Sequence, residues 1–115
     1  MAHLLPSFLH ILRKQWGLSQ PDLAALIGVT ASALSRFENL SRRPTVELII
    51  GTEVIFGQGA RDVFPALYHE VERTILKRAC DLQKQLERSN DPARAEKLHL
   101  LAEIIERADP TTLVL

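Results

Sequence analysis

The sequence predicts an all-α protein with a helical domain over residues 1–59 and a helical extension over residues 60–115. Apolar residues recur three and four positions apart along most of the chain, which is the spacing of amphipathic helices. Serine or threonine precedes several of these segments and glycine follows them, as is typical of helix ends. Strand-type alternation of apolar and polar residues does not persist, so we expect no sheet.

Composition narrows the class of protein. Of the 115 residues, 46% are hydrophobic and 24% are charged, which is the mixture of a globular chain. Lys plus Arg and Asp plus Glu each number 14, and this balance excludes a histone-like polycation but not a small basic patch. The single cysteine, Cys80, cannot form an internal disulfide, which favours a cytoplasmic protein. We expect neither a membrane span nor a secretory signal.

Two short helices are expected first. The first has an apolar face formed by Phe8, Ile11 and Leu12, with Trp16 four residues beyond Leu12. Gly17 should end it, because glycine commonly closes helices in the left-handed conformation. Ser19 should begin the second helix, with Asp22 at the position of a capping-box carboxylate, and Gly28 should end it. The free amides at the start of this second helix would suit a phosphate.

A third helix should follow at once, over residues 30–38, with Thr30 as its N-cap. Its apolar side is formed by Val29, Leu34 and Phe37. Its other side is formed by Ser32, Ser35, Arg36 and Asn39. A loop should precede Pro44, and a fourth helix should run from about Thr45, with apolar positions at Val46, Ile49, Ile50, Val54 and Ile55.

The extension should form a helical hairpin. After a short turn near residues 60–64, one long helix carries Leu67, Tyr68, Val71, Ile75, Leu82 and Leu86 on its apolar positions. The segment SNDP at residues 89–92 should break it, and a last helix should end near residue 109, followed by the apolar tail at residues 111–115. Nine basic and ten acidic residues after residue 60 argue against a basic arm that binds a polyanion, and they favour a surface for dimerisation or partner binding.

Residues 20–38, QPDLAALIGVTASALSRFE, meet the demands of a helix-turn-helix in order. Ala24 is small where the two helices cross, and Gly28 supplies the left-handed turn between them. The whole text LRKQWGLSQPDLAALIGVTASALSRFEN, followed by RRPT, resembles the Cro and phage-repressor-like (XRE-type) helix-turn-helix family. The resemblance covers roughly residues 7–57 and implies a lambda-repressor-like bundle of four to five helices that binds double-stranded operator DNA.

The resemblance also assigns roles to individual residues. Gln20 matches a glutamine that contacts phosphate and supports a base-reading side chain. The exposed positions of the recognition helix are matched by Thr30, Ala31, Ser32, Ser35 and Arg36. Arg42 and Arg43 fall in a loop that approaches the DNA backbone, and Arg13 with Glu38 matches a structural basic–acidic pair. One position departs from the family pattern, because Leu40 stands where glycine is common.

The chemistry of the residues points the same way. Arg36 is the only long cation on the outer side of the third helix, and its planar fork suits guanine O6 and N7 in the major groove. With about three or four phosphate contacts a single protomer should bind modestly, which favours a homodimer acting as a repressor on two half-sites.

Other readings are open at this stage. The C-terminal helices and the tail at residues 111–115 could instead bind a partner protein, as in an antitoxin-type regulator. A helical protein-binding adaptor without DNA contact is a further alternative, and a small-molecule pocket between the last two helices is compatible with the sequence. We expect no enzyme, cofactor or metal site, because the four histidines are scattered and no serine lies in a nucleophile-elbow pattern.

Overall fold

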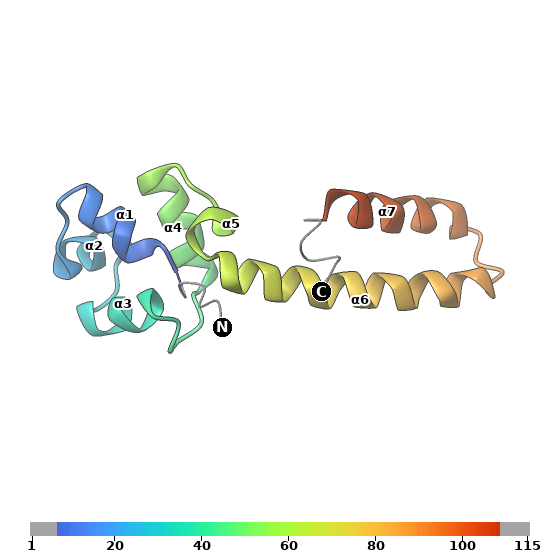
Figure 1. The fold of residues 1–115 in the computed structure, drawn as a ribbon, viewed down its shortest axis with the longest axis horizontal. Helices are drawn as coiled ribbons and strands as arrows, with labels where there is room; N and C mark the ends of the chain where they lie inside the picture. Colours follow the sequence, from blue (N-terminus) through green and yellow to red (C-terminus); the bar gives the residue numbers. More distant parts are fainter. Residues whose placement is uncertain (1–6, 109–115) are drawn as a thin grey trace, which may run out of the picture. The chain divides into compact units, whose positions relative to one another are not determined.

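A computed structural model describes residues 7–108, and within this range every regular element is a helix (Figure 1). The helices are α1 (Leu9–Gln15), α2 (Gln20–Ile27), α3 (Ala31–Glu38), α4 (Val46–Phe56), α5 (Ala60–Val63), α6 (Pro65–Glu87) and α7 (Arg94–Arg107). The all-α prediction is therefore confirmed. The tail at residues 111–115 lies outside the described residues. None of the described helices combines the length and the apolarity that crossing a membrane requires.

The chain divides into two compact units, one ending at Tyr68 and one beginning at His69, so that α6 contributes to both. The sequence placed the domain boundary earlier, after residue 59. The division falls later because Val63 and Phe64 are fully buried in the first core and Leu67 packs against it. Phe8 also donates its backbone N–H to the carbonyl of Val63 at 2.8 Å, which ties the start of α1 to α5.

The core of the first unit draws on five helices. Its buried members are Leu9, Leu12, Leu23, Ala24, Leu34, Phe37, Leu48, Val63 and Phe64. Two expected apolar faces differ from those observed. Phe8 and Trp16 are 37% and 72% exposed, and the buried apolar face of α1 is formed by Leu9 and Leu12. In α4 the buried residues are Leu48 and Thr52, whereas the expected positions Val46 and Val54 are 68% and 79% exposed.

That misassignment has a simple cause. Eight of the eleven residues of α4, VELIIGTEVIF, are apolar or glycine, and they are distributed around the whole helix. Periodicity therefore identifies the helix without identifying which side faces the core. Position in the fold decides it, because α4 packs against α2 and α5.

The second unit is a hairpin in which α7 returns alongside the C-terminal part of α6 (Figure 1). Its core is small and consists of Ala79, Leu86 and Leu101, with Leu98 and Ile104 packed against them. Asp91, in the connection, accepts a hydrogen bond from the backbone N–H of Ala93 and pairs with Lys97. These contacts hold the pKa of Asp91 below its ordinary value, with the Lys97 ammonium as the largest cause.

Candidate nucleic-acid interface

The turn between α2 and α3 depends on Gly28. Its backbone is left-handed, with φ of 91° and ψ of 33°, a conformation that glycine adopts without steric cost. The N–H groups of Gly28 and Val29 both donate to the carbonyl of Ala24, at 2.8 and 3.0 Å, and so close the end of α2. A Cβ at residue 28 would meet no atom within 4 Å, so the backbone conformation and not crowding favours glycine here.

Each of the two helices begins with the cap that the sequence predicts. Ser19 Oγ accepts the N–H of Asp22 at 3.1 Å, and the Asp22 carboxylate accepts the N–H of Ser19 at 2.9 Å, which completes a capping box. Thr30 Oγ1 accepts the N–H of Ala33 at 3.0 Å. Such caps satisfy helix-end donors that have no partner within the helix.

This capping changes the expectation for the start of α2. Pro21 has no N–H, and the N–H of Asp22 is already used by Ser19. The Asp22 carboxylate also brings negative charge to this helix end, and its hydrogen bonds with the backbone and side chain of Ser19 lower its pKa. The backbone amides expected there for a phosphate are thus largely taken, so a phosphate contact at this helix start depends mainly on the side chain of Gln20 and stays a prediction.

The third helix has one buried and one accessible side. Leu34 and Phe37 are 0% and 1% exposed and fix α3 in the core. On the other side Thr30, Ser32 and Arg36 are exposed, whereas Ala31 and Ser35 are half-buried. Within residues 7–108, no hydrogen bond or ion pair engages the Arg36 side chain, so its five N–H donors are available to another molecule.

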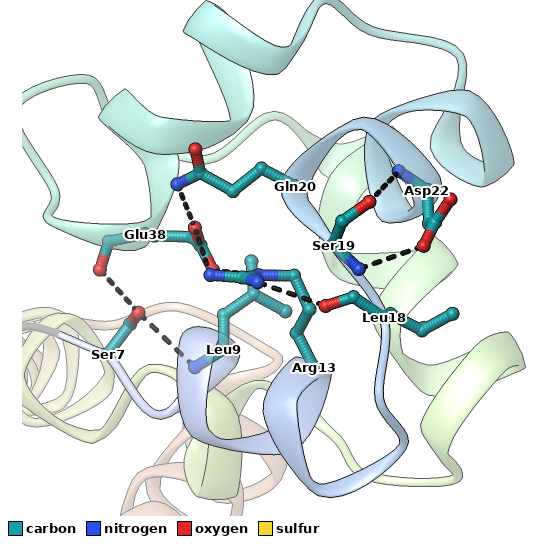
Figure 2. Close-up of polar contacts among 8 residues, drawn as sticks. All are labelled: Ser7, Leu9, Arg13, Leu18, Ser19, Gln20, Asp22 and Glu38. Carbon is teal, nitrogen blue, oxygen red and sulfur yellow. Dashed lines mark hydrogen bonds and ion pairs between the residues drawn. The ribbon is translucent and has the colours of Figure 1, made fainter.

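A buried ion pair holds the far end of α3 to α1 (Figure 2). Arg13 Nε lies 3.0 Å from Glu38 Oε2, and the two side chains are only 10% and 6% exposed. Arg13 Nη1 also donates to the carbonyl of Leu18 at 3.0 Å, and Ser7 Oγ donates to the backbone carbonyl of Glu38 at 2.6 Å. These contacts join the start of α1, the α1–α2 connection and the end of α3.

Gln20 belongs to the same network. Its Nε2 donates to Glu38 Oε1 at 2.8 Å, so the first side chain of α2 is fixed to the last residue of α3. Figure 2 shows the Gln20 side chain extended across the pair, with its amide oxygen turned away from the carboxylate. An amide nitrogen carries two hydrogens, so one N–H remains after the bond to Glu38. Gln20 therefore positions α3 and retains one donor.

The loop after α3 has a left-handed residue at Leu40, where φ is 56°. This is the position at which the related family commonly has glycine, and Leu40 adopts the glycine-like conformation while packing against the core. Asn39 Oδ1 accepts the N–H of Ser41 at 2.8 Å, which stabilises the turn. Arg42 and Arg43 are both exposed, and the Arg42 guanidinium lies 5.0 Å from the ring centroid of Phe37.

The segment that contains α3 has more basic than acidic residues although the chain is neutral. Between residues 23 and 46 the basic residues are Arg36, Arg42 and Arg43, and the one acidic residue is Glu38. The exposed Asp22 and Glu47 lie just outside this segment. Glu38 is 7% exposed and is paired with Arg13, so it contributes little repulsion toward a polyanion. This stretch thus presents cations and hydroxyls to solvent, which are the groups that contact phosphates and base edges.

Residues 9–51 match a family model described as Helix-turn-helix, from the first residue of α1 into α4. They are a helix-turn-helix domain of the Cro/phage-repressor-like (XRE) type. This is a DNA-binding regulatory family and not an enzyme family. No curated protein and no solved structure matches the chain.

The structure of the XRE-type domain adds partners that sequence reasoning missed. Ser7 and the carbonyl of Leu18 complete the network around Arg13 and Glu38. A backbone carbonyl leaves no trace in a sequence, and one serine near a helix start is too common to be informative. The stacking of Arg42 on Phe37 was equally unforeseen, because it depends on the path of the 39–43 loop.

Proposed function

We propose that the protein is a sequence-specific transcriptional regulator that inserts α3 into the major groove of operator DNA. The observation that carries the proposal is the accessible polar side of α3, on which Arg36 has no partner among the described residues. A major groove admits one helix, and an arginine fork that contacts guanine discriminates against other bases by about 1–3 kcal/mol.

The other proposed contacts are of two kinds, with base edges and with phosphates. Ser32 and Ser35 accept or donate hydrogen bonds to base edges, Thr30 contacts base or backbone, and Ala31 meets a thymine methyl group. Arg42 and Arg43 contact phosphates, and the remaining N–H of Gln20 supports a phosphate contact at the start of α2. With about three phosphate contacts per protomer, the binding constant should fall with salt with a logarithmic slope near −3.

The protein acts as a homodimer in this proposal. A modest affinity per protomer favours two recognition helices about 34 Å apart, which read half-sites separated by one turn of DNA. The second unit, from His69 onward, supplies the joining surface. Repression then follows from occupation of a promoter, which excludes the polymerase.

Selection of bound DNA from a random pool tests this proposal. We expect an enriched, two-fold symmetric sequence with half-site centres about ten base pairs apart. Enrichment of a single unpaired half-site would contradict the dimer but would still support base reading by α3. Recovery of no enriched sequence at low salt would contradict base reading itself, because electrostatic binding is strongest there.

A further inference from the structure

The apolar surface of the α6–α7 hairpin is only partly covered within one chain. Val71, Ile75 and Leu82 on α6 are 46%, 44% and 41% exposed, and Leu100 on α7 is 52% exposed. The α6 residues are four and seven positions apart, so they lie along one stripe of the helix. Leu100 likewise precedes Ile104 by four residues.

A narrow groove runs along this stripe. It has a volume of about 180 Å³ and is lined by Ile75, Arg78, Ala79, Leu82, Leu101 and Ile104. Pockets for small ligands enclose roughly 300–1,000 Å³ and contain several placed polar groups. This groove is smaller and almost wholly apolar, so it suits inserted aliphatic side chains better than a metabolite.

The hairpin has a small core of its own. Within residues 69–108 its buried members are Ala79, Leu86 and Leu101, with Leu98 and Ile104 packed against them. The apolar stripe on α6 lies largely outside this core, and exposed apolar stripes of this kind mark interaction surfaces. A second copy of the hairpin would supply matching aliphatic side chains to cover it.

We propose that the groove of one hairpin receives the exposed leucine and isoleucine side chains of a second copy of this chain, so that two hairpins close into a four-helix bundle. The inference rests on the proposed dimeric regulator and identifies its joining surface. The stripe is suited to a second copy because it supplies both the groove and the side chains that flank it, as a two-fold interface requires.

The charges beside the groove favour the same occupant. Arg78 lines the groove on the α6 side, and within residues 7–108 it has no ion pair. On α7, Glu96 lies four residues before Leu100 on the same helical stripe, and among residues 7–108 its carboxylate has no ion pair. Glu103, three residues after Leu100, is already paired with Arg107 and His99. When α6 of one copy packs on α7 of the other, Arg78 of each copy can therefore approach Glu96 of the other.

Sedimentation equilibrium of the full chain over a concentration series tests the proposal. The parent should show twice the chain mass of 12.9 kDa. Leu82→Lys and Leu100→Lys should each raise the dimer dissociation constant at least about tenfold, as truncation of interface anchors does. Matched controls are Cys80→Lys and Ala102→Lys, which add the same charge at exposed positions about 200° around each helix. The controls should remain dimeric.

The possible results separate this inference from the rest of the proposed function. Far-ultraviolet circular dichroism establishes that each variant keeps its helices. If Leu82→Lys unfolds, the test depends on Leu100→Lys, which changes a more exposed residue. A dimeric parent whose groove variants remain dimeric would overturn the inference, and loss of the dimer in Val54→Lys would then place the interface on α4. A parent with the mass of one chain at every concentration would overturn both the proposed groove interface and the proposed dimer. Base reading by α3 would remain open, because DNA selection tests it separately.

Discussion

Replacement of Glu38 by glutamine should destabilise the first unit strongly. The substitution keeps the size of the side chain but leaves the Arg13 guanidinium, whose side chain is 10% exposed, without its carboxylate. Removal of one partner from a buried ion pair typically costs about 3–5 kcal/mol, because an uncompensated charge stays buried. The glutamine oxygen can still accept one hydrogen bond from Arg13 or Gln20, so we expect a loss of about 3 kcal/mol in the free energy of unfolding.

Urea unfolding followed by far-ultraviolet circular dichroism measures this loss. Trp16, the one tryptophan of the chain, is 72% exposed, so its fluorescence is a weak probe of the unfolding of the first unit. The midpoint should fall by at least about 1 M urea for a slope of 1–3 kcal/mol/M. Glu53→Gln, at an exposed position of α4, is the matched control and should change the stability by less than about 0.5 kcal/mol.

A double variant adds a stricter criterion. Arg13→Met combined with Glu38→Leu removes both charges, and such replacements of buried pairs by apolar residues are often neutral. The double variant should therefore be more stable than Glu38→Gln. If Glu38→Gln behaves like Glu53→Gln, the reasoning from burial and pairing is refuted.

Two other stability predictions concern single positions. Leu40→Gly should be more stable than Leu40→Ala by up to about 1 kcal/mol. The reason is that glycine relieves the strain of the left-handed backbone, about 1–2 kcal/mol, and this gain exceeds the entropy cost of glycine. A higher melting temperature for Leu40→Ala than for Leu40→Gly would contradict backbone strain at this residue. Asp22→Asn should lower the melting temperature at pH 7, because its folded-state pKa is depressed by Ser19. The stabilisation by the Asp22 carboxylate is fully present above the ordinary pKa of 3.8 and is lost as the pH falls through the folded-state pKa. The melting temperatures of parent and variant should therefore converge in acid. A difference in melting temperature that is the same at every pH would contradict this explanation.

Local signals in the sequence identified the helix-turn-helix well. Ser19, Asp22 and Thr30 have side chains that can cap a helix, and Gly28 tolerates a left-handed backbone, so these residues report helix ends through contacts with their immediate neighbours. Such contacts span only a few residues and are readable from the chain. The same holds for the buried side of α3, where Leu34 and Phe37 follow helical spacing.

Long-range contacts were less accessible. The sequence did not show that Gln20 is bonded to Glu38, because the two residues are 18 positions apart and meet only after α2 and α3 cross. It also did not show which side of α4 is buried, because apolar residues surround that helix and Val54 stays exposed. The resemblance to the XRE family supplied the Arg13–Glu38 pairing, which residue spacing alone does not imply.

The most direct test of the account is the affinity of Arg36→Ala for DNA. Fluorescence anisotropy should compare its binding to the selected operator and to a scrambled duplex at one salt concentration, with Arg94→Ala, an exposed arginine of the second unit, as the control. We predict a loss on the operator of about 5- to 150-fold, corresponding to 1–3 kcal/mol, with a much smaller loss on the scrambled duplex and none for Arg94→Ala. An Arg36→Ala protein that binds its operator as tightly as the parent would contradict the insertion of α3 into the major groove.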